Sequence, residues 1–535
     1  MSTKQTVNRS VVTLAVLGSL VLVNLIGLKL FRRLDLTEDR QFSLSSATIS
    51  TLQGLTDPLT IRAYFTSDLP PPYSAHARYV RDLLEEYYAR SSGKVRYEFV
   101  DPEAAETDED KEKKKDVKHD IFGRPVRAQT SVERDLDALG IQPVQMQVNQ
   151  GDKVEVKRAY MGIAVSYGGK QEAIPVVQDT AGLEYDLTTI VRKLASTSRP
   201  KIVMLSGHDS PDPEKELGRS MGLLRQLYDV DMLDLATAKE VPADATALLV
   251  VGPRTALSED EQKAIDAFVA KGGSAAFFLD AVKANLEDLN AEETAHGLGD
   301  LLKSYGVEIE RGLVLDAQCA SLTVQHQRGF LRIEEPVHYP FIPQPKSLNA
   351  DNPLTRGLGS VVLPFVSPLK VAAPQGSDVK TDVLVDSSQQ SWVQSPPYDL
   401  NPMRQWTRED VGEEGVHSLI VSVTGVMPSK FQAESTANAE PARIVVAGGS
   451  GFMADRFFSP GNEALLLNVM DWLVRDDALL AIRTRGLRAA PLADVADSTR
   501  RSVKYANILG APVLCILFGL MRWRRRESRR SRVSV

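Results

Sequence analysis

Three polar residues of the kinds used in acid–base and nucleophilic chemistry follow one apolar run of the sequence. The run KIVMLSGHDS, residues 201–210, ends in His208, Asp209 and Ser210, the residue types of a hydrolytic triad. The members of a triad must converge in space, whereas side chains of sequence neighbours normally point in different directions. Three interpretations therefore stand side by side: a catalytic site, a contact with a ligand or partner, and a plain turn.

A second stretch, AGGSGFMAD at residues 447–455, comes close to two functional motifs. The nucleophile elbow G-x-S-x-G would need glycine at the position of Phe452. A dinucleotide loop of the form G-x-G-x-x-A is present, but no strand that ends in an acidic residue follows about twenty residues on. We therefore expect a tight turn between a strand and a helix, with Ser450 and Gly451 as contacts for a ligand or partner.

The sequence lacks the motifs of several other kinds of chemistry. No segment matches the phosphate-binding loop G-x-x-x-x-G-K-S/T, so energy from ATP must come from a partner. Cys319 and Cys515 are the two cysteines of the chain, which excludes dithiol redox chemistry. The seven histidines are scattered, and the closest pair, His326 and His338, does not form a zinc-binding spacing. We expect no metal site and no cofactor.

Two long apolar segments stand near the ends of the chain. The first, residues 11–31, contains one charge, at Lys29, and is long enough to span a bilayer. The second, residues 505–523, has an aromatic residue at each end, as is typical of membrane interfaces. No signal-peptidase site follows the first segment. We expect an uncleaved anchor within residues 1–33 and a second transmembrane helix at residues 505–521.

The distribution of charge indicates on which side of the membrane the body of the chain lies. The tail, residues 522–535, carries seven arginines and one glutamate, so we place both termini in the cytoplasm. A large external body without an intramolecular disulfide is common in a bacterial periplasm. The two ends have net charges of +5 and +6 and the whole chain has −7, which leaves −18 on the body. An acidic body argues against nucleic-acid binding. We expect a two-span protein of the bacterial inner membrane, embedded in the lipid bilayer, with a periplasmic body.

Residues 34–198 are expected to form a first α/β domain. Residues 57–66 and 94–103 predict strands, and the helix between them makes a βαβ unit whose strands lie parallel. Ser74 is the expected N-cap of this helix. Residues 155–177 then predict paired strands, and residues 183–196 predict a helix that ends the domain.

Residues 199–482 are expected to form a second domain. The short apolar runs at 201–207, 245–252 and 274–280 are typical of buried parallel strands. Between the second and the third, Ser258 and Glu261 predict a capping box at the start of a helix. Alternating strands and helices indicate a doubly wound sheet. The remaining expected boundaries are a proline-rich insertion near 337–401 and a linker at 483–504.

Small residues recur along the two apolar segments. Small side chains let another helix pack closely, and an asparagine within the bilayer needs a polar partner. We expect six residues to form helix-packing faces: Ala15, Ser19, Asn24, Ala511, Cys515 and Gly519.

The order of several segments resembles one bacterial family. RLDLTEDRQFSLSSAT, VMLSGHDS, RIVVAGGSGFMAD and NEALLLNVMDWLV, bracketed by two membrane segments, are similar to the gliding-motility-associated auxiliary family of ABC transporters. The resemblance implies a thioredoxin-like first domain, a glutamine-amidotransferase-like second domain, and a separate permease and cytoplasmic ATPase as partners. The family usually has glycine and an acidic residue after SGH, where this chain has Asp209 and Ser210.

The resemblance also indicates where an amidotransferase would carry its nucleophile. Class I enzymes place a cysteine in the sharp turn after a central strand. The corresponding stretch here has Phe278, Leu279 and Asp280, so thiol-based amide hydrolysis is excluded at this turn.

We expect a non-enzymatic accessory subunit of an ABC transporter, working in gliding motility or envelope export and contacting cargo or an envelope polymer. His208, Asp209, Ser450 and Gly451 are its expected contacts with a ligand or partner. Two alternatives stay open. One is an envelope hydrolase or amidotransferase-like enzyme with His208 and Asp209 as acid–base residues, and the other is a polysaccharide-binding module with exposed aromatic residues around Trp392 and Tyr398.

Overall fold

The structure, a computed structural model, describes most of residues 43–482, together with residues 18–19 and parts of 504–524. The longest gaps in the described body are at 108–116, 373–378 and 432–439. Contacts divide the chain into two units, residues 1–488 and residues 489–535. The first unit is a mixed α/β structure, as predicted, and both of its larger sheets contain parallel and antiparallel pairs.

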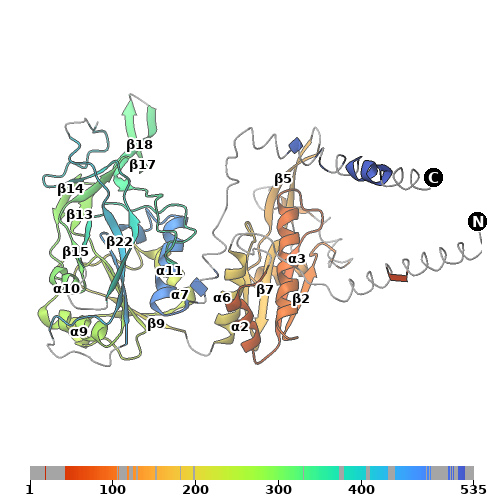
Figure 1. Ribbon diagram of the computed structural model, residues 1–535, viewed down its shortest axis with the longest axis horizontal. Helices are drawn as coiled ribbons and strands as arrows, with labels where there is room; N and C mark the ends of the chain where they lie inside the picture. The colour runs from red at the N-terminus through yellow and green to blue at the C-terminus, as the bar shows by residue number, and fades with distance from the viewer. Residues whose placement is uncertain are drawn as a thin grey trace, which may run out of the picture. The chain divides into compact units, whose positions relative to one another are not determined.

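The first sheet has four strands in the order β2-β1-β7-β8, of which β2 and β7 are labelled in Figure 1. Strands β1 (Leu59–Phe65) and β2 (Val95–Val100) run parallel. Strand β7 (Met161–Tyr167) is antiparallel both to β1 and to β8 (Lys170–Ile174). The predicted βαβ unit and the predicted strand pair are both confirmed.

Three helices complete the core of this sheet: α2 (Ser46–Gly54), α3 (Tyr73–Arg90) and α6 (Leu183–Ala195). Their apolar residues Leu52, Leu84 and Val191 share one buried cluster with strand residues such as Ile61 and Ile163. The strand residues recur at every second position, which places them on one face of the sheet.

The predicted N-cap of helix α3 is wrong by two residues. The helix begins at Tyr73 and its N-cap is Pro72, not Ser74. The carbonyl of Pro72 already accepts the N–H of Ala75 at 2.8 Å. Proline has its φ fixed near the helical value, so the turn that precedes the helix can pass into it before a hydroxyl cap is reached.

The second sheet has nine strands. Its main path is β10-β9-β11-β12-β23-β22-β19-β15, and β20 pairs with β22. Neighbours from β10 to β23 are parallel, whereas β22 is antiparallel to β23, and β19, β20 and β15 continue with antiparallel pairs. The bounds are β9 (Lys201–Leu205), β10 (Asp229–Leu233), β11 (Ala247–Val251), β12 (Ser274–Phe278), β15 (Val307–Ile309), β19 (Leu369–Val371), β20 (Lys380–Asp386), β22 (Ser418–Gly425) and β23 (Ala442–Ala447). The three runs predicted as parallel strands are confirmed as β9, β11 and β12.

Apolar clusters lie on both faces of this sheet. In β9, Ile202 and Met204 belong to one cluster and Val203 and Leu205 to the other, as the alternation of side chains in a strand requires. Helices α7 (Gly218–Leu227) and α11 (Pro460–Leu473) contribute to the first cluster, and helices α9 (Glu259–Ala270) and α10 (Gly299–Ser304) to the second. The predicted capping box of Ser258 and Glu261 is confirmed at the start of α9.

The remaining elements of the described body are short helices and two-stranded sheets. They are α5 (Ser131–Ala138), α8 (Leu235–Ala238), the 3-10 helix η1 (Gly451–Met453), and the pairs β3 (Val117–His119) with β4 (Pro125–Arg127), β5 (Val144–Gln150) with β6 (Lys153–Ala159), β13 (Val282–Asn285) with β14 (Asn290–Glu293), β16 (Leu313–Asp316) with β21 (Ser391–Gln394), and β17 (Cys319–Arg328) with β18 (Leu331–Pro343). The proline-rich residues 337–401 thus include β19 and β20 of the nine-stranded sheet.

The second unit contains a described helical stretch at residues 516–524. Within the described residues, no helix is both long enough and apolar enough to cross a membrane. Of the two predicted spans, residues 11–31 lie outside the described residues except for 18 and 19, whereas seven of the 19 positions of 505–523 lie outside them.

Candidate functional site

Four strand ends of the nine-stranded sheet meet at one edge. Strands β9, β11, β12 and β23 are parallel neighbours, and ligands of open α/β sheets bind beyond the carboxyl ends of such strands. The loop 206–217 follows β9 and the loop 252–258 follows β11. Asp280 stands just beyond β12, and Ser450 stands just beyond β23.

The side chain of His208 contacts helix α9. Its Nε2 lies 2.9 Å from Oε1 of Glu261, whose side chain is buried. The other oxygen of Glu261 accepts the amide and hydroxyl hydrogens of Ser258, both at 2.7 Å. Burial acts to raise the pKa of Glu261, but the hydrogen bonds from Ser258 and His208 outweigh it and lower the pKa. His208 therefore connects the loop after β9 to the first turn of α9.

The backbone of His208 connects the same loop to the next strand end. Its carbonyl accepts the N–H groups of Arg254 and Thr255, at 2.8 and 3.1 Å. His208 and Asp209 have φ angles of 54° and 53°, a left-handed conformation that is uncommon for residues with a Cβ atom. These contacts hold the loop in a conformation that its residues do not favour on their own.

The three sequence neighbours of this loop do not converge. His208 faces Glu261, whereas the exposed carboxylate of Asp209 lies 3.7 Å from Nζ of Lys283. The hydroxyl of Ser210 is buried and has no hydrogen-bond partner in the described part of the chain. The described geometry therefore does not bring these side chains together as a triad.

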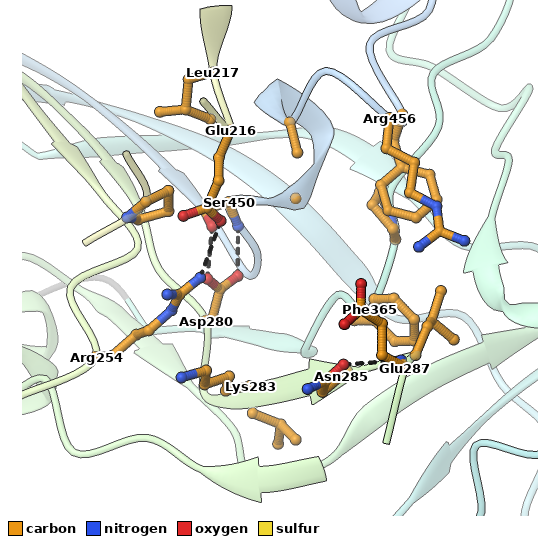
Figure 2. Close-up of a pocket in the computed structure, with 18 residues that line it drawn as sticks. Glu216, Leu217, Arg254, Asp280, Lys283, Asn285, Glu287, Phe365, Ser450 and Arg456 are labelled. Carbon is orange, nitrogen blue, oxygen red and sulfur yellow. Dashed lines mark hydrogen bonds and ion pairs between the residues drawn. The ribbon is translucent and has the colours of Figure 1, made fainter. Parts of the chain in front are cut away.

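Asp280 and Ser450 join the ends of β12 and β23 (Figure 2). Oδ1 of Asp280 accepts the amide hydrogen of Ser450 and Oδ2 accepts its hydroxyl hydrogen, both at 2.6 Å. Removal from water raises the pKa of Asp280, while the Ser450 hydrogen bonds and the Arg254 guanidinium act in the opposite direction. A polar connection of this kind is stable when buried because both partners are satisfied.

Gly252, at the end of β11, lies directly against this pair. A Cβ atom at that position would stand 2.7 Å from Oγ of Ser450 and 3.0 Å from Oδ2 of Asp280. The φ angle of Gly252 is +49°, which glycine adopts at no steric cost. The ends of β11, β12 and β23 thus approach one another because the residue that follows β11, Gly252, has no side chain.

A cavity of about 350 Å³ borders the Asp280–Ser450 pair, and its volume is in the range of small-molecule sites. Figure 2 shows charged side chains around it. The cations are Arg254, Lys283 and Arg456, and the carboxylates are Glu216, Asp280 and Glu287. Arg254 lies 3.5 Å from Glu216, and Lys283 faces Asp209 outside the lining.

The structure separates the predicted contact residues into two groups. Ser450 and Gly451 line the cavity, whereas His208 and Asp209 stand beside it and do not line it. Arg254 and Arg456 line the cavity although neither was predicted as a contact residue, and Asp280 was noted only because no cysteine stands at its turn. A usable signal was present, since Asp280 is the last residue of one predicted parallel strand and Arg254 lies two residues beyond another, where ligand contacts gather.

The aromatic residues proposed for polysaccharide binding are not both exposed. Trp392 is 5% exposed and packs against Trp406, with ring centroids 5.8 Å apart. It belongs to an apolar cluster with Leu313 and Phe341. The expectation of an exposed Trp392 is therefore wrong, because the strand β21 that carries it pairs with β16 over this cluster.

The remaining predictions concern metal binding and the helix-packing residues. In the described part of the chain, no group of three or more His, Cys, Asp or Glu side chains is arranged to hold a metal ion. Of the predicted helix-packing residues, Ser19 and Gly519 are described, both in helical conformation. The other four lie outside the described residues: Ala15, Asn24, Ala511 and Cys515.

Two regions of the chain match models of known protein families. Residues 199–474 match the family model described as "ABC-type uncharacterized transport system", and residues 38–166 match a domain of unknown function, DUF7088. An uncharacterized protein of Borreliella burgdorferi is 24% identical over 510 residues, which cover 92% of this chain and 93% of that protein. A solved structure, "mmIFT52 N-terminal domain", aligns with 51% of this chain and 96% of its own at 12% identity and a TM-score of 0.32.

Proposed function

Because the chain belongs to the family of ABC-type uncharacterized transport system proteins, we propose that it is a non-enzymatic accessory subunit working with a separate permease and ATPase. The association with an ABC-type transport system comes from the family. The absence of a phosphate-binding loop from the sequence supports a separate ATPase, because ATP hydrolysis of this type needs that loop.

One observation carries the proposal of a binding role rather than a catalytic one. At the turn after β12, where an amidotransferase would carry its nucleophile, stands Asp280, and both of its oxygens accept hydrogens from Ser450. A carboxylate held in this way fixes the geometry of the strand ends. The side chain of His208 is bound to Glu261, so it acts as a link between the loop after β9 and helix α9.

The proposed architecture refines the mixed α/β fold. The first sheet, with α3 between its parallel strands β1 and β2, supports a thioredoxin-like domain. The nine-stranded sheet, with parallel strands running outward from β9 to β10 on one side and to β11 and β12 on the other, supports a doubly wound, amidotransferase-like domain. In this proposal, loops at the carboxyl edge of the second sheet contact cargo or an envelope component.

The proposed location is the bacterial inner membrane, with both termini cytoplasmic and the body periplasmic. The helical stretch 516–524 supports an anchor, because its apolar residues Ile516, Phe518 and Met521 are more than half exposed. Exposed apolar side chains in a row are unfavourable in water and favourable in lipid. Anchors at both ends of the body would let rearrangements of the permease act on the periplasmic domains, in gliding motility or in envelope export.

The experiment that tests this function is affinity purification of the tagged full chain from gently solubilised membranes, followed by mass spectrometry. We expect an ATPase of the ABC type and a multispan permease in a constant ratio to the tagged chain. An unrelated two-span membrane protein with the same tag is the control. Recovery of the tagged chain alone, in a detergent that preserves other membrane complexes, would contradict the proposal.

A further inference from the structure

Most charged groups around the cavity already have a partner. Arg254 faces Glu216 at 3.5 Å, and Lys283 faces Asp209 at 3.7 Å. Asp280 accepts two hydrogens from Ser450. These groups shape the cavity, but their charges are largely balanced before a ligand arrives.

Two charged residues of the cavity lining, one cation and one anion, lack a charged partner among the described residues. Within the described residues, the guanidinium of Arg456 has no carboxylate at ion-pair distance, and its neighbour is the ring of Phe457, whose centroid is 5.5 Å away. The carboxylate of Glu287 likewise has no hydrogen bond or ion pair to a described residue. Figure 2 shows Arg456 and Glu287 on the same side of the cavity as Phe365. One free cation and one free anion face the same space.

The surface around these two groups is apolar. Phe365, Phe457 and Leu286 line the cavity there and are half-buried. Phe365 has a φ angle of +53°, a conformation that is a clear outlier for a bulky residue. Such strain is kept where the surrounding structure requires it, and it gathers at ligand sites. The amide of Phe365 is held by the carbonyl of Phe341 at 2.8 Å.

From this arrangement we propose that the cavity binds a free α-amino acid with an apolar side chain. The ligand carboxylate would lie on Arg456, whose planar guanidinium suits bidentate contact with a carboxylate. The ligand ammonium would lie on Glu287, and the apolar side chain would lie against Phe365 and Phe457. The charges of a zwitterion match the one cation and one anion that are unpaired, whereas a purely anionic or purely cationic ligand would leave one of them without a partner.

This inference rests on the proposed function, because it names the ligand class at the edge that is proposed to contact cargo. Its test uses the full chain in detergent and isothermal titration with four matched probes. L-phenylalanine carries all three features, N-acetyl-L-phenylalanine lacks the ammonium, L-phenylalaninamide lacks the carboxylate, and glycine lacks the apolar side chain. We expect L-phenylalanine to bind at least about tenfold more tightly than each of the other three probes. Each of those probes lacks either one charged contact or the apolar contact.

Two variants assign the contacts. Arg456→Gln should weaken L-phenylalanine about tenfold and leave L-phenylalaninamide unchanged, because the amide has no carboxylate to lose. Glu287→Gln should weaken L-phenylalanine similarly and leave N-acetyl-L-phenylalanine unchanged. Arg62→Gln removes an arginine of strand β1 that lies outside the cavity lining, and it should change none of these affinities.

The inference is overturned by absence of L-phenylalanine binding, by equal affinity for the four probes, or by an Arg456→Gln variant that binds as the wild type does. O-phosphoethanolamine, the zwitterion of a lipid headgroup, is a further probe, and its tighter binding would overturn the assignment to an amino acid. Co-purification of permease and ATPase is measured in the same preparations. Intact partner recovery without ligand binding would refute this inference alone, and ligand binding without partner recovery would refute the proposed function alone.

Discussion

The carboxylate of Asp280 accepts both the amide and the hydroxyl hydrogen of Ser450, at 2.6 Å each. The two residues are 170 positions apart in the chain and follow two parallel strands that are neighbours in the sheet, β12 and β23. Their contact joins the loop that leads into the β13–β14 hairpin to the turn that leads into α11. It therefore couples the two sides of the candidate cavity.

We expect Ser450→Ala to lower the free energy of unfolding by about 1–3 kcal/mol, because one oxygen of the half-buried carboxylate of Asp280 loses its donor. Chemical denaturation followed by tryptophan fluorescence measures this loss. Ser67→Ala is a matched control, since the amide and hydroxyl of Ser67 also both donate to one carboxylate, that of Asp101, but in an exposed position. Its effect should stay within about 0.5 kcal/mol, and equal losses in the two variants would contradict the importance of burial.

Replacement by alanine should destabilise the folded protein at one glycine, Gly252, and stabilise it at another, Gly222. Gly252→Ala should lower the free energy of unfolding by about 1–3 kcal/mol, because the residue has a φ of +49° and its new Cβ would stand 2.7 Å from Oγ of Ser450. Gly222→Ala, in the exposed interior of helix α7 with no heavy atom within 4 Å of the added Cβ, should gain about 0.5–1 kcal/mol. Denaturation midpoints of both variants test the pair, and a harmless Gly252→Ala would argue against close approach of the three strand ends.

The stability contributed by Glu261 should depend on pH with a definite sign. Its pKa in the folded protein is below the ordinary glutamate value of 4.5, so the folded state favours the charged form. The contribution is therefore present above pH 4.5 and is lost as the pH falls through the lower folded pKa. Glu261→Gln should cost about 1–3 kcal/mol at neutral pH, through the weakened cap and the lost contact with His208. Denaturation at neutral and acidic pH should show the difference shrinking, and a constant difference would contradict this account.

Local signals in the sequence were enough to predict several elements. The capping box of Ser258 and Glu261 is predictable because both hydrogen bonds form within one turn of chain. The strands β9, β11 and β12 are predictable because continuous apolar runs with turn residues at their ends are typical of buried strands. The N-cap of α3 was not, since the backbone turn before Tyr73 and not a side chain decides where that helix begins.

The candidate site was less predictable because its residues meet through long-range pairing. The sequence placed His208 and Ser450 after strands, but the order of the strands decides which ends are adjacent. Arg254, Asp280 and Arg456 gather around one cavity only after β12 pairs with both β11 and β23. No spacing in the sequence encodes that adjacency, and the same holds for the burial of Trp392.

Replacement of His208 and Asp209 by alanine should leave the proposed accessory function intact. The pair removes one partner of Glu261 and one of Lys283, so we expect a loss of about 1 kcal/mol in stability with unchanged recovery of permease and ATPase. An envelope hydrolase that used these residues as acid and base would lose its turnover of amide or glycan substrates. Turnover measured on purified wild-type and doubly substituted protein tests this, and a turnover that disappears in the variant would refute the non-enzymatic proposal.

Larger side chains on the packing face of the predicted second membrane segment should show whether the segment only anchors the chain or also binds a partner helix. Leucine at Ala511, Cys515 and Gly519 keeps the segment apolar, so insertion into the membrane should persist, but a partner helix could no longer approach closely. A close-packed face contributes about 1–2 kcal/mol to helix association, so its loss should lower recovery of the permease roughly tenfold. Val513→Leu with Ile516→Leu puts leucine elsewhere on the segment and is the matched control. If both variants recover the permease as the wild type does, the segment serves as an anchor and the partner must be held through the body of the chain, residues 34–482.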